Sequence, residues 1–149
     1  MKRTFGTILI VASVVLAGAV IDAAPVVTGG GVLQIDELVG QYKLADGQPY
    51  RQDIIADDSL TTVELIQVRE GLEEQSHSRH QLTLWVVRGA VRVTLGYEKH
   101  KLAAGTVITV PPKTPYSVYS LSGGVAVLVG VYSPSFRGKD RVYENSSGQ

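Results

Sequence analysis

The chain has 149 residues, 44% of them apolar, and its 14 basic and 14 acidic side chains give a formal charge of zero. This length has room for one domain, and the composition is too apolar and too weakly charged for a disordered chain. Neutrality offers no attraction for nucleic acid or an anionic membrane surface, and the lack of cysteine excludes disulfides, thiolate nucleophiles and zinc–sulfur sites.

The first segment has the pattern of an export signal. Lys2 and Arg3 precede an apolar run from Phe5 to Ile21, and small residues follow it. Such a run is close to the roughly 17 residues that a membrane span needs at minimum, so an uncleaved anchor is the alternative. We therefore expect residues 1–24 to be a signal peptide or N-terminal anchor, residues 25–31 to be a flexible linker, and the protein to be exported to the periplasm or secreted.

The rest of the chain predicts short strands. Apolar or alternating runs rich in Val, Ile, Thr and aromatic residues recur between Gly, Pro, Asp and Ser, which is typical of an all-β barrel or sandwich. The predicted strands are Val32–Leu38, Ile54–Ile55, Thr61–Val68, Leu82–Val87, Val91–Leu95, Thr106–Val110, Tyr116–Leu121 and Val125–Tyr132. They place one β-barrel over residues 32–138, followed by a polar tail at 139–149.

The run Leu82–Val87 is apolar at nearly every position. A strand of this kind is expected to be covered on both faces, either by a second layer or by a partner subunit. By alternation, Trp85 should point away from the face that carries Leu82, where it would pack against a sheet or a dimer partner. This pattern contributes to the prediction of a homodimer.

Two spaced motifs carry a family resemblance. The first has Gly71, then His77 after five intervening residues, and Gly89; the second has Gly105 and then Pro111, again with five residues between them. Their spacing resembles the two conserved boxes of the cupin superfamily, over roughly residues 63–131. The resemblance implies a cupin-type double-stranded β-helix, a jelly-roll barrel.

In that family a divalent metal is bound by two His and a Glu or Gln of the first box and one His of the second. The resemblance puts His77 on the first ligand position. The other three positions fall on Arg79, Leu82 and Tyr116, with His80 and Gln81 each one residue away from a ligand position. Leucine has no ligand atom and arginine repels a cation, so a standard metal site is not expected; His77 and His80 are the remaining candidates, for iron, manganese, zinc or copper.

Three functional hypotheses follow. The first is an exported protein that binds a small molecule in the barrel mouth, with weak catalysis or none. The second is an isomerase, lyase or oxygenase-type enzyme with an altered metal site or no metal, and the third is a structural dimer without a ligand. The residues assigned to the site are His77 and Tyr116 as base and acid, and Arg79, His80, Gln81 and Lys113 as ligand-binding residues.

Several other polar residues have simpler interpretations. Glu64, Glu73 and Glu74 are expected to be solvent-facing charges. The segment around His77 and His80 is expected to be a polar loop, and His100 is expected to lie exposed in a charged turn.

Overall fold

The computed structural model describes residues 31–136 and 140–143, so the predicted leader and most of the predicted linker lie outside the described residues. In chain order the elements are α1 (Ile35–Gln41), β1 (Tyr50–Asp57), β2 (Thr62–Val68), β3 (Gly71–His77), β4 (Gln81–Arg88), β5 (Ala90–Leu95), β6 (Glu98–Ala103), β7 (Val107–Val110), β8 (Tyr116–Ser120), β9 (Ala126–Ser133) and β10 (Arg141–Tyr143). None of the helices in this part of the chain has the length and hydrophobicity that a membrane crossing requires.

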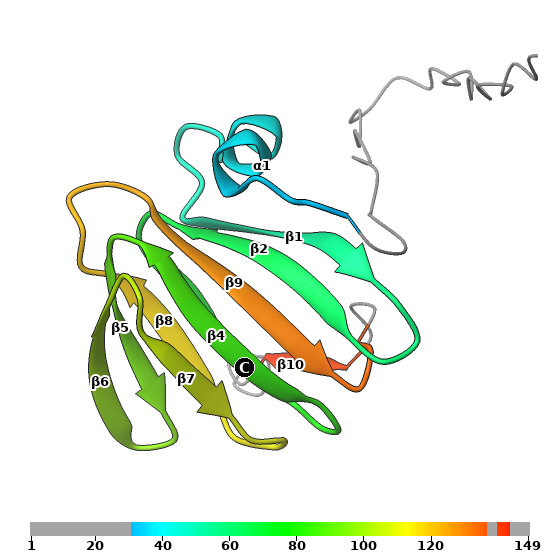
Figure 1. The fold of residues 1–149 in the computed structure, drawn as a ribbon. Helices are drawn as coiled ribbons and strands as arrows, with labels where there is room; N and C mark the ends of the chain where they lie inside the picture. The colour runs from blue at the N-terminus through cyan, green and yellow to red at the C-terminus, as the bar shows by residue number, and fades with distance from the viewer. Residues whose placement is uncertain (1–30, 137–139, 144–149) are drawn as a thin grey trace, which may run out of the picture.

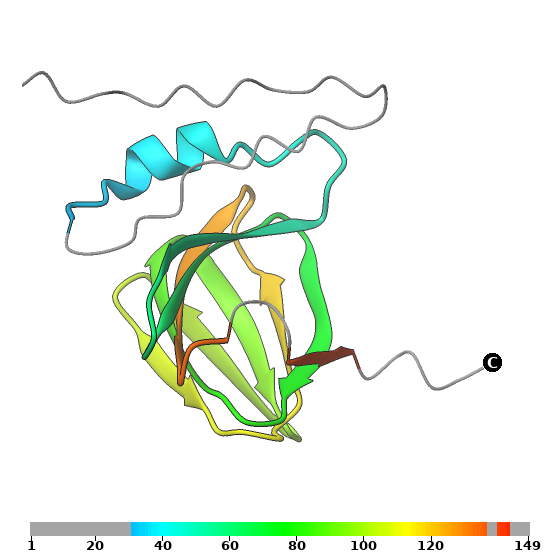
Figure 2. The same cartoon turned by 90° about the vertical axis from the view of Figure 1, so that its right-hand side faces the viewer.

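The strands form two antiparallel five-stranded sheets that face each other (Figure 1). The first sheet has the order β1-β2-β9-β4-β7, and the second has the order β10-β3-β8-β5-β6. Turning the molecule by 90° shows the two sheets curved around a shared interior, with α1 on the outside (Figure 2). The all-β jelly-roll prediction is therefore confirmed.

Alternation of side chains builds the core between the sheets. In β4, Leu82, Leu84 and Val86 are fully buried, whereas Trp85 is 51% exposed on the opposite face. Trp85 thus points away from the interior, as the pattern predicted. However, the expectation that β4 is covered on both faces is wrong for the isolated chain, because its outer residues are exposed or only half-buried.

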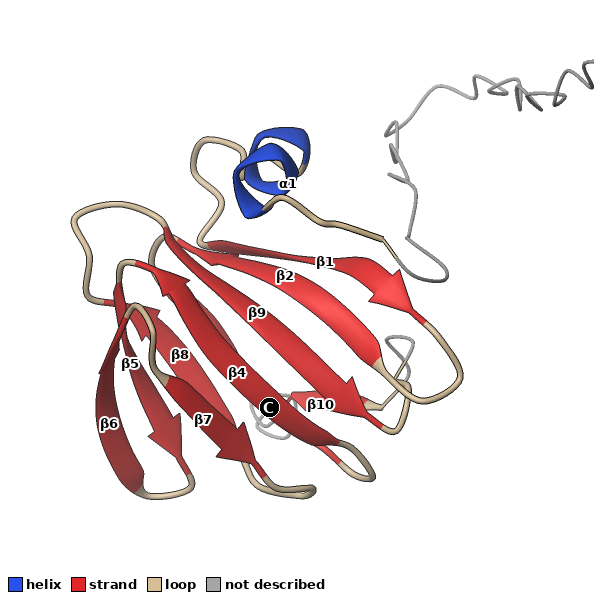
Figure 3. Cartoon of the chain, in the orientation of Figure 1, coloured by secondary structure: helices blue, strands red, loops and turns tan. Residues whose placement is uncertain are grey.

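The first described segment is a helix, not the predicted strand Val32–Leu38 (Figure 3). Ile35, Leu38, Val39 and Tyr42 have the i, i+3, i+4, i+7 spacing of one helix face. They pack with Leu65 against the outer face of the first sheet. Residue 65 is buried by the helix, while Ile66, next in the chain, is buried inside the barrel. The strand that is truly covered on both faces is therefore β2.

Three other strands differ from prediction. The segment expected to be a polar loop before the first histidine is β3, and its buried residues include Gln75, Ser76 and His77. The expected charged turn around His100 is β6, and β10 forms within the expected polar tail. These strands are polar, so apolar alternation could not reveal them; pairing with β8, β5 and β3, respectively, supplies their backbone hydrogen bonds.

Candidate functional site

A buried aromatic and polar cluster fills one part of the barrel interior. His77, at the end of β3, has ring contacts with Tyr116 of β8, Tyr132 of β9 and Phe136, with centroid distances of 6.0, 5.0 and 4.9 Å. None of these four side chains is more than 2% exposed. The barrel fold therefore brings together four rings that are separated by up to 59 positions in the sequence.

A chain of hydrogen bonds runs through this cluster. Gln75 Nε2 donates to the Tyr116 hydroxyl at 2.6 Å, and His77 Nε2 lies 3.2 Å from the same hydroxyl. Tyr116 is also hydrogen-bonded to the side chain of Tyr132, whose own hydroxyl donates to Glu64 Oε2 at 2.7 Å. The cluster thus extends from the histidine to a buried carboxylate.

Two proton arrangements fit these hydrogen bonds. The hydroxyl hydrogen of Tyr132 is used on Glu64, and Gln75 donates to the Tyr116 oxygen. With the proton of His77 on Nε2, His77 donates to the same oxygen and Nδ1 carries a free lone pair; with the proton on Nδ1, Tyr116 donates to Nε2.

Glu64 is the opposite of the predicted solvent-facing charge, since it is only 3% exposed. One guanidinium nitrogen of Arg141, in β10, lies 2.9 and 3.0 Å from its two oxygens. The Arg141 guanidinium also lies over the Phe136 ring, 5.0 Å from its centroid. The C-terminal segment therefore places a cation inside the barrel, where it neutralises Glu64.

The surroundings keep the central groups neutral. Burial, followed by the positive charge of Arg141, lowers the pKa of His77 to about 4. Burial raises the pKa of Tyr116 and of Tyr132 well above their ordinary range, because a phenolate would lose its hydration. At neutral pH the cluster therefore contains an uncharged imidazole and two uncharged phenols.

A second polar group lies beside His77 at the β3–β4 turn. His80 Nδ1 is 2.5 Å from Asp140 Oδ2, and Asp140 also accepts hydrogen bonds from the Ser78 hydroxyl and from the Arg79 backbone N–H. Burial opposes ionisation of Asp140, but these three hydrogen bonds outweigh it and lower its pKa to about 2. Asp140 is therefore a carboxylate held in a fixed position.

His77, His80 and Asp140 together can hold a metal ion. One ring nitrogen from each histidine and one carboxylate oxygen lie within 4.8 Å of one another. Two imidazoles and a carboxylate are a common donor set for transition metals, and His77 Nδ1 has no hydrogen-bond partner although it is buried. The residues present therefore fit a metal. This ligand set differs from that of the family, because Leu82 and Tyr116 occupy two of the family's ligand positions.

Two further buried atoms near His77 have no hydrogen-bond partner: Gln75 Oε1 and Arg141 Nε. Both residues also use other atoms in the cluster, because Gln75 donates to Tyr116 and Arg141 binds Glu64. Unpaired buried polar atoms are rare in proteins, since each one forgoes its hydration. These atoms therefore indicate where a ligand would find hydrogen-bond partners.

The structure divides the residues assigned to the site from sequence. His77, His80 and Tyr116 lie in or beside the buried cluster. Arg79, Gln81 and Lys113 are exposed to solvent, and Lys113 has a left-handed backbone with φ of 62°. The side chains of these three residues make no contact with the cluster in any interaction found among the described residues.

Sequence reasoning missed six residues of the site: Glu64, Gln75, Tyr132, Phe136, Asp140 and Arg141. Glu64 and Tyr132 lie on the same alternating positions as apolar neighbours that face the core, and this was a usable signal. No comparable signal marks Asp140 and Arg141, which follow the barrel strands in a polar segment. They reach the site only because β10 pairs with β3.

Comparison with known proteins agrees with this architecture. The family model described as "Cupin domain" matches residues 62–132, which run from the first residue of β2 to the last but one residue of β9. The barrel segment 62–132 is therefore a cupin domain, and the predicted resemblance to the cupin superfamily is confirmed. Both boxes of the predicted motif lie inside the matched segment.

Among curated proteins, an uncharacterised protein from Aquifex aeolicus is 36% identical to this cupin over 66 residues, which cover 44% of this chain. The match spans about half, 54%, of that relative's own length. Among solved structures, the nucleoside dehydratase Pac13 from Streptomyces is 26% identical, with a TM-score of 0.57 over 64% of this chain and 78% of its own. Variants of Pac13 have been solved with uridine.

Two other solved structures share the fold at lower identity. KdgF from Halomonas sp. is 22% identical, with a TM-score of 0.58 over 66% of this cupin and 94% of its own chain. A double-stranded β-helix protein from Klebsiella pneumoniae is 16% identical, with a TM-score of 0.63 over 71% and 91% of the two chains. The structural neighbours of this cupin thus include an enzyme that acts on nucleosides.

Proposed function

We propose that this protein is an exported cupin that binds a small polar molecule at the His77 end of the barrel, with weak catalysis or none. The observation that carries the proposal is the set of unpaired buried atoms on Gln75, His77 and Arg141. A buried polar group without a partner costs about 1–3 kcal/mol, so a ligand that pairs with several of them gains binding energy there.

The unpaired atoms specify what the ligand must present. Gln75 Oε1 needs a donor and Arg141 Nε needs an acceptor. His77 Nδ1 needs a donor when the ring proton is on Nε2 and an acceptor when the proton is on Nδ1. A neutral molecule with neighbouring hydroxyl groups offers both kinds of partner, whereas an apolar molecule offers neither.

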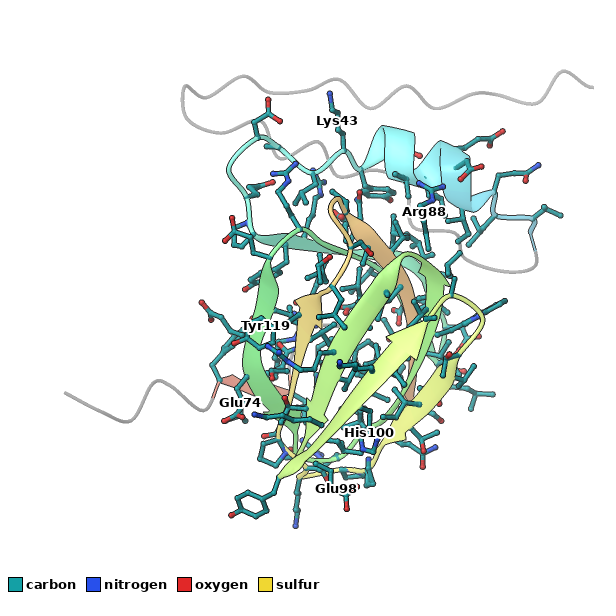
Figure 4. All side chains as sticks on the ribbon, turned by 90° about the vertical axis from the view of Figure 1, so that its left-hand side faces the viewer. Lys43, Glu74, Arg88, Glu98, His100 and Tyr119 are labelled. Carbon is teal, nitrogen blue, oxygen red and sulfur yellow. The ribbon has the colours of Figure 1, made fainter. Side chains whose placement is uncertain are left out.

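Uridine is the first probe, because it is polar, hydroxylated and bound by the 26%-identical Pac13. We expect uridine to raise the unfolding temperature of this protein, and Tyr116→Phe to reduce that shift. Tyr119→Phe is the matched control, because Tyr119 lies on the same strand but faces solvent (Figure 4). If uridine, ribose and glycerol all leave the unfolding temperature unchanged, the proposal fails for hydroxylated ligands.

A metal-independent lyase is the second candidate, and the 3.2 Å contact between His77 and Tyr116 favours it. Eliminating water needs a base that takes a C–H proton and an acid that protonates the departing hydroxyl, as a carbon–carbon double bond forms. His77, with its proton on Nε2, offers a lone pair on Nδ1 for the first role, and Tyr116 is a neutral phenol for the second. Loss of 18 mass units from a nucleoside, abolished by Tyr116→Phe and retained with EDTA, tests this candidate.

Two parts of the proposal concern partners. The cofactor that we expect is a divalent metal, iron, manganese, zinc or copper, bound by His77 and His80. We also propose a homodimer that covers the outer face of β4, where Trp85 and Val107 are 51% and 55% exposed. Trp85→Ser should convert a dimer into a monomer in light scattering; a wild-type monomer at high concentration contradicts this part.

A further inference from the structure

We propose that His77, His80 and Asp140 form a divalent-metal site whose third ligand comes from the C-terminal segment, outside both cupin boxes. The metal class is a borderline transition ion such as Zn²⁺ or Co²⁺. This inference deepens the proposed function, on whose site it rests. It also gives His80 and Asp140 the ligand role that the three replaced family positions, Arg79, Leu82 and Tyr116, do not fill.

The three ligands reach one point from separate segments. His77 ends β3, His80 lies in the β3–β4 turn, and Asp140 directly precedes β10. Their ligand atoms lie within 4.8 Å of one another, and both histidines are at least 92% buried. Two neutral imidazoles and one carboxylate suit a tetrahedral zinc-type ion that keeps its fourth position open.

His77 is prepared for this role by its hydrogen bonds. In the tautomer that leaves Nδ1 free for a metal, the Nε2–H of His77 is donated to Tyr116, whose position is in turn held by Gln75. Metal-bound histidines usually donate their other N–H in this way, which orients the ring and raises the basicity of the ligand nitrogen. The nitrogen left over, Nδ1, is buried without a partner, so it can bind an ion without losing another contact.

Asp140 is oriented by contacts that a metal need not disturb. The Ser78 hydroxyl bonds to Oδ1, and the Arg79 backbone N–H bonds to Oδ2. In the absence of metal, His80 Nδ1 shares a proton with Oδ2 at 2.5 Å. A metal ion would take the place of that proton between the imidazole and the carboxylate, as metal sites do when they release protons on binding.

The nearby charges favour a cation at this place. Arg141, the cation that lowers the pKa of His77, is paired with Glu64 at 2.9 Å. Asp140 is held by the Ser78 hydroxyl, the Arg79 backbone N–H and the His80 ring, so it supplies one negative charge at the site. A divalent ion therefore meets a net negative charge of one rather than a net positive site.

The test is a titration of the metal-free full chain with Co²⁺, followed by its visible absorption and by calorimetry. We expect one equivalent to bind, with the intense bands of a four- or five-coordinate ion. Asp140→Asn and His80→Gln should each weaken binding by roughly tenfold or more. His100→Gln is the matched control, because His100 Nε2 lies 3.4 Å from Glu98 on the opposite sheet edge without a third ligand (Figure 4).

A second measurement needs no variant. Because Asp140 precedes β10, metal binding should slow amide hydrogen exchange at Arg141–Tyr143 in the wild-type chain. The proposal is overturned if Co²⁺ does not bind, or if it binds equally well after Asp140→Asn. If uridine still raises the unfolding temperature in EDTA while Co²⁺ does not bind, only the metal site is refuted. If Co²⁺ binds but no small molecule raises the unfolding temperature, only the proposed ligand is refuted.

Discussion

The ion pair between Arg141 and Glu64 gives the sharpest test of the structure, through the variant Arg141→Met. Their side chains are 16% and 4% exposed, and one guanidinium nitrogen contacts both carboxylate oxygens. Methionine keeps most of the apolar stem that packs near Phe136 but removes the charge. Glu64 is then left as a buried carboxylate without a counter-ion.

Removing one partner of a buried pair costs about 3–5 kcal/mol. Here Tyr132 still donates to Glu64 at 2.7 Å and Gln52 at 3.2 Å, so we expect the lower end, about 3 kcal/mol. For a domain of this size that corresponds to a fall of about 10 °C in the unfolding temperature. Most of the cost is the unpaired charge, so the pair itself adds much less stability than the single substitution suggests.

The assay is urea unfolding followed by circular dichroism, with Arg51→Met as the control. Arg51 pairs with Asp53 at 2.7 Å, but its side chain is 34% exposed, so its loss should cost about 1 kcal/mol or less. The double variant Glu64→Gln/Arg141→Met removes both charges and should recover much of the loss. Equal effects of Arg141→Met and Arg51→Met, or no recovery in the double variant, would refute the buried pair and with it the position of β10.

Three further predictions follow from the same geometry. The pKa of His77 is lowered chiefly by burial from 6.5 to about 4, so the unfolded chain takes up a proton first as the pH falls. The contribution of this histidine to the free energy of unfolding is therefore fully present above pH 6.5 and is lost as the pH falls towards 4. The loss is on the order of 2–3 kcal/mol. Urea unfolding at pH 7 and at pH 4.5 should show that His77→Gln reduces this pH dependence. Tyr116→Phe leaves Gln75 Nε2 and His77 Nε2 without their hydrogen-bond partner and should lower the free energy of unfolding by about 1–3 kcal/mol. Tyr119→Phe, on the solvent side, should change it by less than about 0.5 kcal/mol. Similar losses for the two variants would contradict the hydrogen-bond chain. Gly89→Ala should destabilise the protein more than Gly96→Ala in the same urea assay. Both glycines have positive φ, 80° and 58°, but only at Gly89 would the new Cβ lie 2.5 Å from the Ser122 hydroxyl oxygen. Equal losses would show that the segment around Ser122 moves to make room.

The described barrel was largely predictable because its signals are local. The nearly continuous apolar run Leu82–Val87 indicates a strand, and the glycine and proline spacing in the two boxes indicates the cupin fold. The polar strands β3 and β6 were not predicted, because their sequences show no alternation of apolar and polar residues. Pairing with neighbouring strands stabilises them instead. The helix α1 was also missed, because its seven residues carry only two turns of periodicity.

The candidate site divides in the same way. The sequence by itself determined the fold class and identified His77, His80 and Tyr116, since motif positions are defined by separation along the chain. Only the tertiary structure decided that Glu64 is buried and that Arg141 and Asp140 reach the barrel. Arg141 is 77 positions from its partner Glu64, and Asp140 is 60 positions from its partner His80. Alternation with Ile66 and Val68 marks the side of β2 on which Glu64 lies, but no local pattern reveals Arg141 or Asp140, because strand pairing and not sequence proximity brings them to their buried partners.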